Sequence, residues 1–106
     1  MIVVVGRVST DAEKRDELIS VAQAVASASR REEGCINYRF YEDTERPNEF
    51  VFVEEWADQA ALDRHFATDH IRVFMGSIPG TLIAPPEVWF HTIASSVDLA
   101  AVSAPR

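Results

Sequence analysis

The order of two hydrophobic periodicities along the chain constrains the fold more than any other feature of the sequence. Short runs of β-branched and aromatic residues predict four strands, at residues 2–8, 35–41, 50–56 and 88–93. Apolar residues at helical spacing fill the stretch between the first two strands and the stretch before the last. The order β-α-β-β-α-β predicts an α+β, ferredoxin-like domain, in which two helices cover one face of an antiparallel four-stranded sheet.

Capping residues set the expected limits of the helices. Thr10 followed three residues later by Glu13 is a capping-box pattern, so the first helix is expected to start there. Gly34 is expected to end that helix, because glycine is favoured just after a helix. Asp58 is expected to cap the second helix, which would fall into two pieces if it restarts near 68–69.

The chain has 106 residues, which is enough for one small domain. We place this domain at residues 1–94 and a tail rich in Ala and Ser at 95–106, where a docked arm, a short helix and disorder all stay open. The net charge of -7 would repel a phosphate backbone, so no nucleic acid partner is expected. Cys35 is the single cysteine, which excludes an intrachain disulfide.

The sequence carries no sign of membrane association. Its first residues lack the basic start of a signal peptide, and no apolar stretch approaches the roughly 18 residues of a membrane span. We therefore expect no membrane partner and a cytoplasmic location, which suits a lone reduced thiol.

Both faces of the predicted sheet carry apolar side chains. Alternation along the second strand places Ile36 and Tyr38 on one face and Cys35 on the other. In the third strand Phe52 lies on one face and Val53 on the other. Because two helices cover only one face, we expect a second copy of the chain to cover the other as a homodimer. A monomer with valines scattered on a half-polar face is the alternative.

Three histidines are the candidates for proton transfer, since imidazole has a suitable pKa near neutral pH. His65 and His70 belong to the second helical region, and His91 to the last strand. On one continuous helix His65 and His70 would point about 140° apart, unlike the i, i+4 pair of a helical zinc site. We therefore predict no metal site, although a helix break near Thr68 would let the two histidines converge.

Other chemical motifs are sparse. Trp56 is interpreted either as a core aromatic at the strand end or as a wall for a flat ligand with a free indole N–H. Glu54 and Glu55 are neighbours and point to opposite sheet faces, so they do not form a catalytic pair. The sequence lacks G-x-S-x-G and glycine-rich phosphate loops, which argues against a serine hydrolase and a nucleotide or flavin site.

Several stretches together resemble the antibiotic biosynthesis monooxygenase family. Residues 33–38 are similar to its junction between helix and strand. Residues 50–56 end in Glu-Trp and are followed by Ala-Leu, His65 and His70, as in the quinol-monooxygenase-like branch. The closing run 77–90 also resembles a member of the family, and the whole resemblance covers nearly the complete domain.

The resemblance implies a dimeric α+β barrel with a cavity in each subunit, between sheet and helices. It also implies a cofactor-independent monooxygenase that oxidises a quinol or polycyclic phenol with O2. In such an enzyme the substrate anion supplies the electron, while the protein deprotonates the substrate and shields it from water. The expected partners are a second copy of the chain, a small aromatic substrate and O2, with no cofactor and no metal.

On this basis either His65 or His70 is expected to be the proton acceptor. An apolar substrate pocket is expected to include the following side chains: Trp56, Tyr38, Phe52 and Phe74. Two other functions stay open. The chain could be a non-enzymatic, ligand-binding or stress-related dimer, or an isomerase whose histidines shuttle protons without consuming O2.

Overall fold

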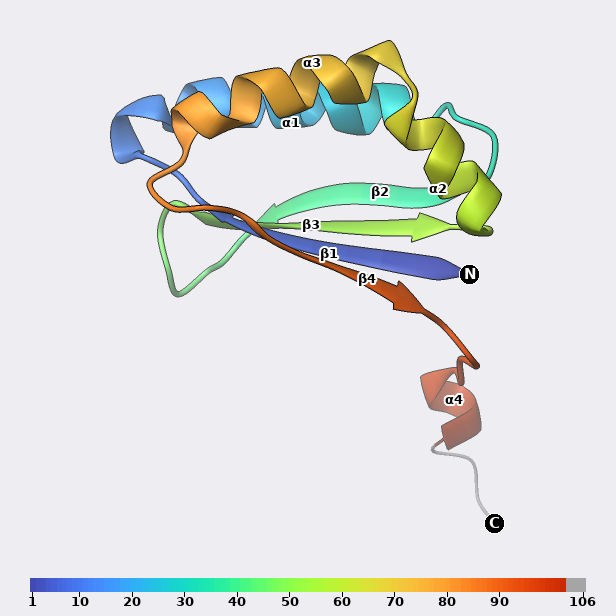
Figure 1. Cartoon of the computed structure of the whole chain (residues 1–106). Coiled ribbons are helices and arrows are strands. Elements are labelled where there is room, and N and C mark those ends of the chain that lie inside the picture. Colours follow the sequence, from blue (N-terminus) through green and yellow to red (C-terminus); the bar gives the residue numbers. More distant parts are fainter. Residues whose placement is uncertain (103–106) are drawn as a thin grey trace.

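A computed structural model describes residues 1–102 of the chain and has the α+β, ferredoxin-like order predicted from the sequence (Figure 1). The strands are β1 (Ile2–Ser9), β2 (Cys35–Glu42), β3 (Glu49–Trp56) and β4 (Glu87–Thr92). The helices are α1 (Arg15–Ser29), α2 (Gln59–Phe66), α3 (Asp69–Ser77) and a short α4 (Leu99–Val102), with 3-10 turns η1 (Ala12–Lys14) and η2 (Ile78–Thr81). The second helical region is therefore divided in two.

The four strands form one antiparallel sheet in the order β2-β3-β1-β4. Helices α1 and α3 lie side by side over one face of this sheet, and α2 lies at the end where β3 finishes (Figure 1). The register places Val4 of β1 between Glu54 of β3 and Phe90 of β4. These three side chains therefore share one face of the sheet.

The hydrophobic core fills the space between the helices and this face. Leu18, Ala22 and Val25 follow one another at helical spacing along α1 and are at most 2% exposed. From the sheet, Phe52 and Trp56 of β3 are buried against them in the same core. Full burial of a large apolar side chain contributes roughly 1.5–3 kcal/mol, so this stripe largely determines where α1 packs.

The opposite face of the sheet carries an uncovered apolar row. Val53 of β3, Val5 of β1 and Trp89 of β4 are paired across the three strands. The two valines are half-buried, whereas Trp89 is 61% exposed. No helix in residues 1–102 lies over this row (Figure 1). An aromatic and two valines in one exposed row are typical of a contact surface.

The predicted faces of β2 are wrong at its start. The pairing of β2 with β3 shifts between Cys35, which pairs with Trp56, and Asn37, which pairs with Glu55. Ile36 is the extra residue of this β-bulge and is 57% exposed, while Cys35 packs against the core. Strict alternation fails here because a bulge inserts one residue and exchanges the two faces.

The predicted cap of the first helix is also wrong. Thr10 does not cap it, because its hydroxyl donates to the Thr81 carbonyl oxygen at 2.7 Å. The Asp11 carboxylate instead accepts the Glu13 backbone N–H at 2.9 Å and caps η1, which leads into α1. Thr10 thus links the connection between β1 and η1 to η2, which lies far away in the sequence.

The chain after β4 leads away from the sheet (Figure 1). Residues 99–102 of the predicted tail form α4, whose side chains are exposed, and residues 103–106 lie outside the described residues. Among the helices of residues 1–102, none has the length and apolar character needed to cross a membrane.

Gly34 occupies a backbone conformation that other residues rarely adopt. Helix α1 ends at Ser29, four residues earlier than expected from the glycine, and Gly34 has a φ of 85° in the connection to β2. A Cβ added here would lie 2.5 Å from the Cβ of Ala61 in α2. Gly34 therefore allows the α1–β2 connection to approach α2 closely.

We predict that Gly34→Ala lowers the free energy of unfolding by about 2 kcal/mol, because it combines positive φ with a steric clash. Urea denaturation followed by circular dichroism measures this change. Gly76→Ala is the matched control: Gly76 is in α3, nothing lies within 4 Å of an added Cβ, and alanine is favoured in a helix. The free energy of unfolding of Gly76→Ala should equal or exceed that of wild type. Equal destabilisation of both variants would contradict the prediction.

Candidate active site

The break between α2 and α3 brings the two helical histidines together. Thr68 caps α3 by accepting the Ile71 backbone N–H, and its hydroxyl donates to the carbonyl oxygen of His65 at 2.7 Å. The chain therefore turns between the helices, and the ring centroids of His65 and His70 are 6.0 Å apart. The two histidines therefore converge, as expected if the helix breaks near Thr68.

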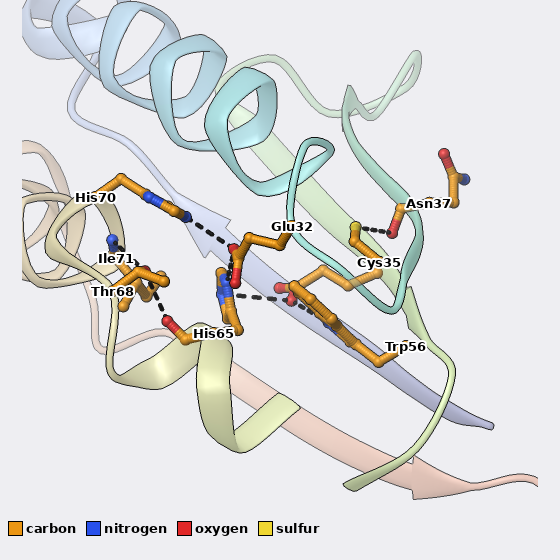
Figure 2. A network of polar contacts seen from close by, with 9 residues as sticks. Glu32, Cys35, Asn37, Trp56, His65, Thr68, His70 and Ile71 are labelled. Carbon is orange, nitrogen blue, oxygen red and sulfur yellow. Dashed lines mark hydrogen bonds and ion pairs between the residues drawn. The ribbon is translucent and has the colours of Figure 1, made fainter. Parts of the chain in front are cut away.

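Glu32 holds both imidazoles from the connection between α1 and β2. Its Oε2 lies 2.6 Å from Nδ1 of His65 and 2.8 Å from Nε2 of His70 (Figure 2). An ionised carboxylate only accepts hydrogen bonds, so both ring nitrogens are donors in this arrangement. A neutral His65 then carries its proton on Nδ1 and has a lone pair on Nε2.

The Nε2 atom of His65 faces a second carboxyl group, Glu54 of β3, whose Oε1 lies 4.0 Å away. Glu54 is 8% exposed, accepts the indole N–H of Trp56 at 3.0 Å and also accepts a hydrogen bond from Tyr38. Burial raises the pKa of Glu54 to about 7, against the opposing effect of these two hydrogen bonds. The negative charge of Glu32 is a smaller contribution to this rise.

Burial changes the pKa of His65 in the opposite direction from that of Glu54. His65 is 1% exposed and its ring packs against the rings of Tyr38 and Trp56. Desolvation lowers the pKa of His65, and the hydrogen bond to Glu32 offsets part of this effect. Low polarity thus favours the neutral forms of both His65 and Glu54.

A cavity of about 260 Å³ lies between the helix-covered face of the sheet and helices α2 and α3. Its lining is mainly apolar and aromatic, with Phe52, Phe74 and Phe90 among the contributing side chains. His65 and Glu54 also line it, and they bring titratable atoms to an otherwise apolar space. A flat, apolar molecule with one polar group suits such a lining.

The structure places four of the six residues predicted for the site around this cavity: His65, Tyr38, Phe52 and Phe74. Trp56 is not a wall of the cavity. It is completely buried in the core, as in the first of the two interpretations, and its indole N–H, which would be free in the second, is bonded to Glu54. His70 is also outside the cavity and lines a shallow groove between α1 and α3.

Two acidic residues of the site, Glu54 and Glu32, are not among the site residues predicted from the sequence. Glu54 could have been found, because it alternates with Phe52 and Trp56, two residues predicted to line the pocket, and so shares their face of the sheet. Glu32 gave no such signal, since it lies among charged residues after a helix and 33 residues before His65. It was also not predicted that Glu32, His65 and His70 would offer three neighbouring atoms able to bind a metal.

Cys35 lies near this cluster but is a poor nucleophile. Burial, together with the nearby charges of Glu32 and Glu54, raises the pKa of its thiol to about 11. The thiol therefore stays protonated near neutral pH. Its packing against the core agrees with a structural role.

Comparison with known proteins places this geometry in context. The family model described as "Antibiotic biosynthesis monooxygenase" matches residues 1–77. A Bacillus subtilis protein named "Putative monooxygenase YcnE" is 38% identical over 88 residues, which cover 83% of this chain and 93% of that protein. An uncharacterized Synechocystis protein is 40% identical over 98 residues, which cover 92% of this chain and 67% of that protein.

Solved structures agree with the sequence relatives. A crystal structure titled "antibiotic biosynthesis monooxygenase" matches with a TM-score of 0.82 and 28% identity, covering 90% of this chain and all of that one. The similarity therefore extends over the sheet and the helices that enclose the cavity.

The raised pKa of Glu54 has a measurable effect on stability. In the unfolded chain this carboxyl has its ordinary pKa of 4.5, whereas the folded protein keeps the proton up to about pH 7. Between these values the folded state binds more protons, so the free energy of unfolding falls as pH rises, by up to about 3 kcal/mol. We predict that Glu54→Gln lacks this decline.

Urea unfolding of metal-free protein at pH 4.5 and pH 8 tests this prediction. From pH 4.5 to pH 8, the free energy of unfolding of wild type should fall relative to that of Glu54→Gln by up to about 3 kcal/mol. Glu45→Gln makes the same chemical change at an exposed position in the β2–β3 loop and should show no such shift. The same pH dependence in wild type and Glu54→Gln would contradict the prediction.

Proposed function

Because the chain belongs to the antibiotic biosynthesis monooxygenase family, we propose that it oxidises a quinol or phenolic ring with O2, without a bound cofactor. One observation carries the proposal: a buried histidine, held at Nδ1 by a carboxylate, lines an apolar, aromatic cavity. The assignment of an activity to this fold rests on the family, since one fold supports many functions.

His65 is the proton acceptor in this proposal. Glu32 accepts the Nδ1 proton of His65, which leaves Nε2 able to take the phenolic proton of a substrate in the cavity. The carboxylate then stabilises the imidazolium, as a carboxylate does in other His-containing catalytic sites. His70 contacts Glu32 from the outer side and acts on His65 only through it, as a positioning residue.

Deprotonation prepares the ring to react with oxygen. The phenolate transfers an electron to O2, and the resulting radicals combine at a ring carbon that bears hydrogen, forming a C–O bond. Breaking the O–O bond and losing the C–H proton turns this carbon into a carbonyl, and the second oxygen atom leaves as water. The ring is oxidised and O2 is fully reduced, so the reaction needs no other reductant.

The apolar lining supports this chemistry. Water is excluded around the phenolate, and its charge is therefore balanced mainly by the imidazolium of His65. Glu54 favours this step when neutral, because an ionised carboxyl beside His65 would repel the substrate anion.

The size of the cavity favours small substrates of this class. Its volume of about 260 Å³ lies just below the roughly 300–1,000 Å³ of pockets for drug-sized ligands. We therefore propose a quinol or phenol with one or two rings in preference to a larger polycyclic one.

Oxygen consumption with a panel of one- and two-ring quinols tests this function. We predict turnover by the wild type and a loss of about 10²–10⁴-fold in kcat/KM for His65→Gln, the range expected for removal of a general base. His91→Gln is the control, because His91 lies in β4 and pairs with Val3, away from the cavity. Equal activity of His65→Gln and wild type would contradict the assignment of the base.

The same panel separates the alternative functions. Thermal stabilisation by a quinol without oxygen uptake would indicate a ligand-binding protein. Conversion of a hydroxy-ketone without oxygen uptake would indicate an isomerase. Either result, with no oxygen consumption above that of buffer alone, would overturn the proposed monooxygenase activity.

We also propose that the chain functions as a homodimer in the cytoplasm. The apolar row of Val53, Val5 and Trp89 supports the dimer, because a second copy packed on it would bury the exposed indole. The single protonated thiol of Cys35 suits a reducing compartment.

We predict that Trp89→Lys converts the dimer to a monomer, because a charged side chain buried in an apolar interface is costly to desolvate. Light scattering coupled to gel filtration should give about twice 11.8 kDa for the wild type and a single chain for the variant. Val73→Lys places a lysine at an equally exposed apolar position on α3 and should leave the dimer intact. A wild-type mass near 11.8 kDa would contradict the dimer.

A further inference from the structure

The cluster of Glu32, His65 and His70 has the composition of a metal site as well as that of a hydrogen-bond network. Each of the three residues offers one ligand atom, and these atoms all lie within 4.8 Å of one another. Glu32 Oε2 contacts Nδ1 of His65 and Nε2 of His70. They come from three separate segments of the chain, which converge at the α2–α3 break (Figure 2). We propose that these three side chains bind a divalent transition cation, with Zn²⁺ as the representative ion.

The observed spacing is close to that of a coordinated ion. Zinc holds nitrogen and oxygen ligands at about 2.0–2.2 Å in a tetrahedron, so the ligand atoms lie roughly 3.3 Å apart. Glu32 Oε2 now lies 2.6 and 2.8 Å from the two ring nitrogens, because a proton occupies each gap. A cation that replaces both protons requires a separation of roughly half an ångström more, which rotation of the Glu32 side chain supplies.

The donor atoms suit zinc and its neighbours in the first transition row. Two imidazoles and one carboxylate form the set of zinc sites that keep a fourth position for water. The set carries one negative charge when both imidazoles are neutral, so a divalent cation leaves a single net positive charge. Nitrogen ligands favour this class over magnesium and calcium, which prefer oxygen.

A second observation, independent of the three ligands, supports a metal. Histidines that bind a metal through one nitrogen usually donate the other ring N–H to a carboxylate. Glu54 lies on that side of His65, with its Oε1 4.0 Å from Nε2, a gap that a small side-chain movement would close to a hydrogen bond on metal binding. Its location is fixed by the indole of Trp56, which donates to the same oxygen at 3.0 Å.

A cation can reach the cluster without passing through the buried cavity. The side chain of His70 is 27% exposed, and it borders the groove between α1 and α3. Asp69 lines the same groove, where its carboxylate is paired with Arg72. The net charge of -7 also favours the approach of cations.

Metal binding would move the ring proton of His65 from Nδ1 to Nε2. With the metal on Nδ1, a neutral imidazole carries its proton on Nε2, where it can donate to Glu54. Nε2 then has no lone pair for a substrate. The cation would therefore inhibit the proposed oxygenation, and this consequence, unlike the site itself, rests on the proposed function.

Calorimetric titration of Zn²⁺ into metal-free protein tests the site directly. The chain is used without an affinity tag, so that its three histidines are the only ones present. We expect one equivalent of zinc per chain with a dissociation constant in the micromolar range or tighter. Zinc binding no tighter than millimolar would overturn the proposal.

Three variants separate this site from adventitious binding. His70→Gln removes a coordinating nitrogen at a partly exposed position and should weaken binding by more than about 100-fold, whereas Glu54→Gln, which alters only the outer partner, should weaken it by about tenfold. His91→Gln changes the histidine outside the cluster and should bind zinc like the wild type. Equal affinities of His70→Gln and wild type would contradict the assignment.

Nitrogen-15 NMR of the histidine rings tests the exchange of protonation without any assay of turnover. In metal-free protein His65 should carry its proton on Nδ1, and at saturating zinc on Nε2, with Nδ1 shifted to the range of a metal-bound nitrogen. A His65 that keeps its Nδ1 proton in the presence of zinc would overturn the proposed coordination. A protein that binds zinc but consumes no oxygen would refute the proposed function and leave the metal site supported.

Discussion

The shared carboxylate of Glu32 is the interaction on which the candidate site depends. It joins the connection after α1 to the end of α2 and the start of α3, and it orients His65 through Nδ1. This bond determines which nitrogen of His65 faces the cavity. Gly34 allows the joined segments to approach, since the positive φ and the missing Cβ bring the connection against Ala61.

Burial gives the cavity its chemical character. Desolvation raises the pKa of Glu54 and lowers that of His65, so both groups are driven toward their uncharged forms in the same space. A neutral phenol can enter such a cavity without meeting a fixed charge, and charge develops only when its proton moves to His65. The arrangement that suits proton transfer also provides ligands for a cation, because an imidazole that accepts a proton can equally bind a metal.

The sequence predicted the fold well where one local signal governed the structure. The element order follows from the two periodicities, and Asp58 caps α2 as expected by accepting the Ala61 N–H at 2.8 Å. Prediction from the sequence failed where a contact with a residue far away in the chain determined the local structure. Thr10 bonds to η2 instead of capping a helix, and the β-bulge at Ile36 follows from pairing with β3.

The sequence by itself determined the order of the elements and the aromatic residues of the buried face, because these follow from neighbours along the chain. It left the break between α2 and α3 open as one of two possibilities. Only the tertiary structure decided which polar atoms meet. Glu32 reaches His65 across 33 residues, and Trp56 turns its N–H to Glu54 instead of the cavity. No local pattern encodes such contacts, because the packing of helices on the sheet fixes the distances between residues that are far apart in the chain.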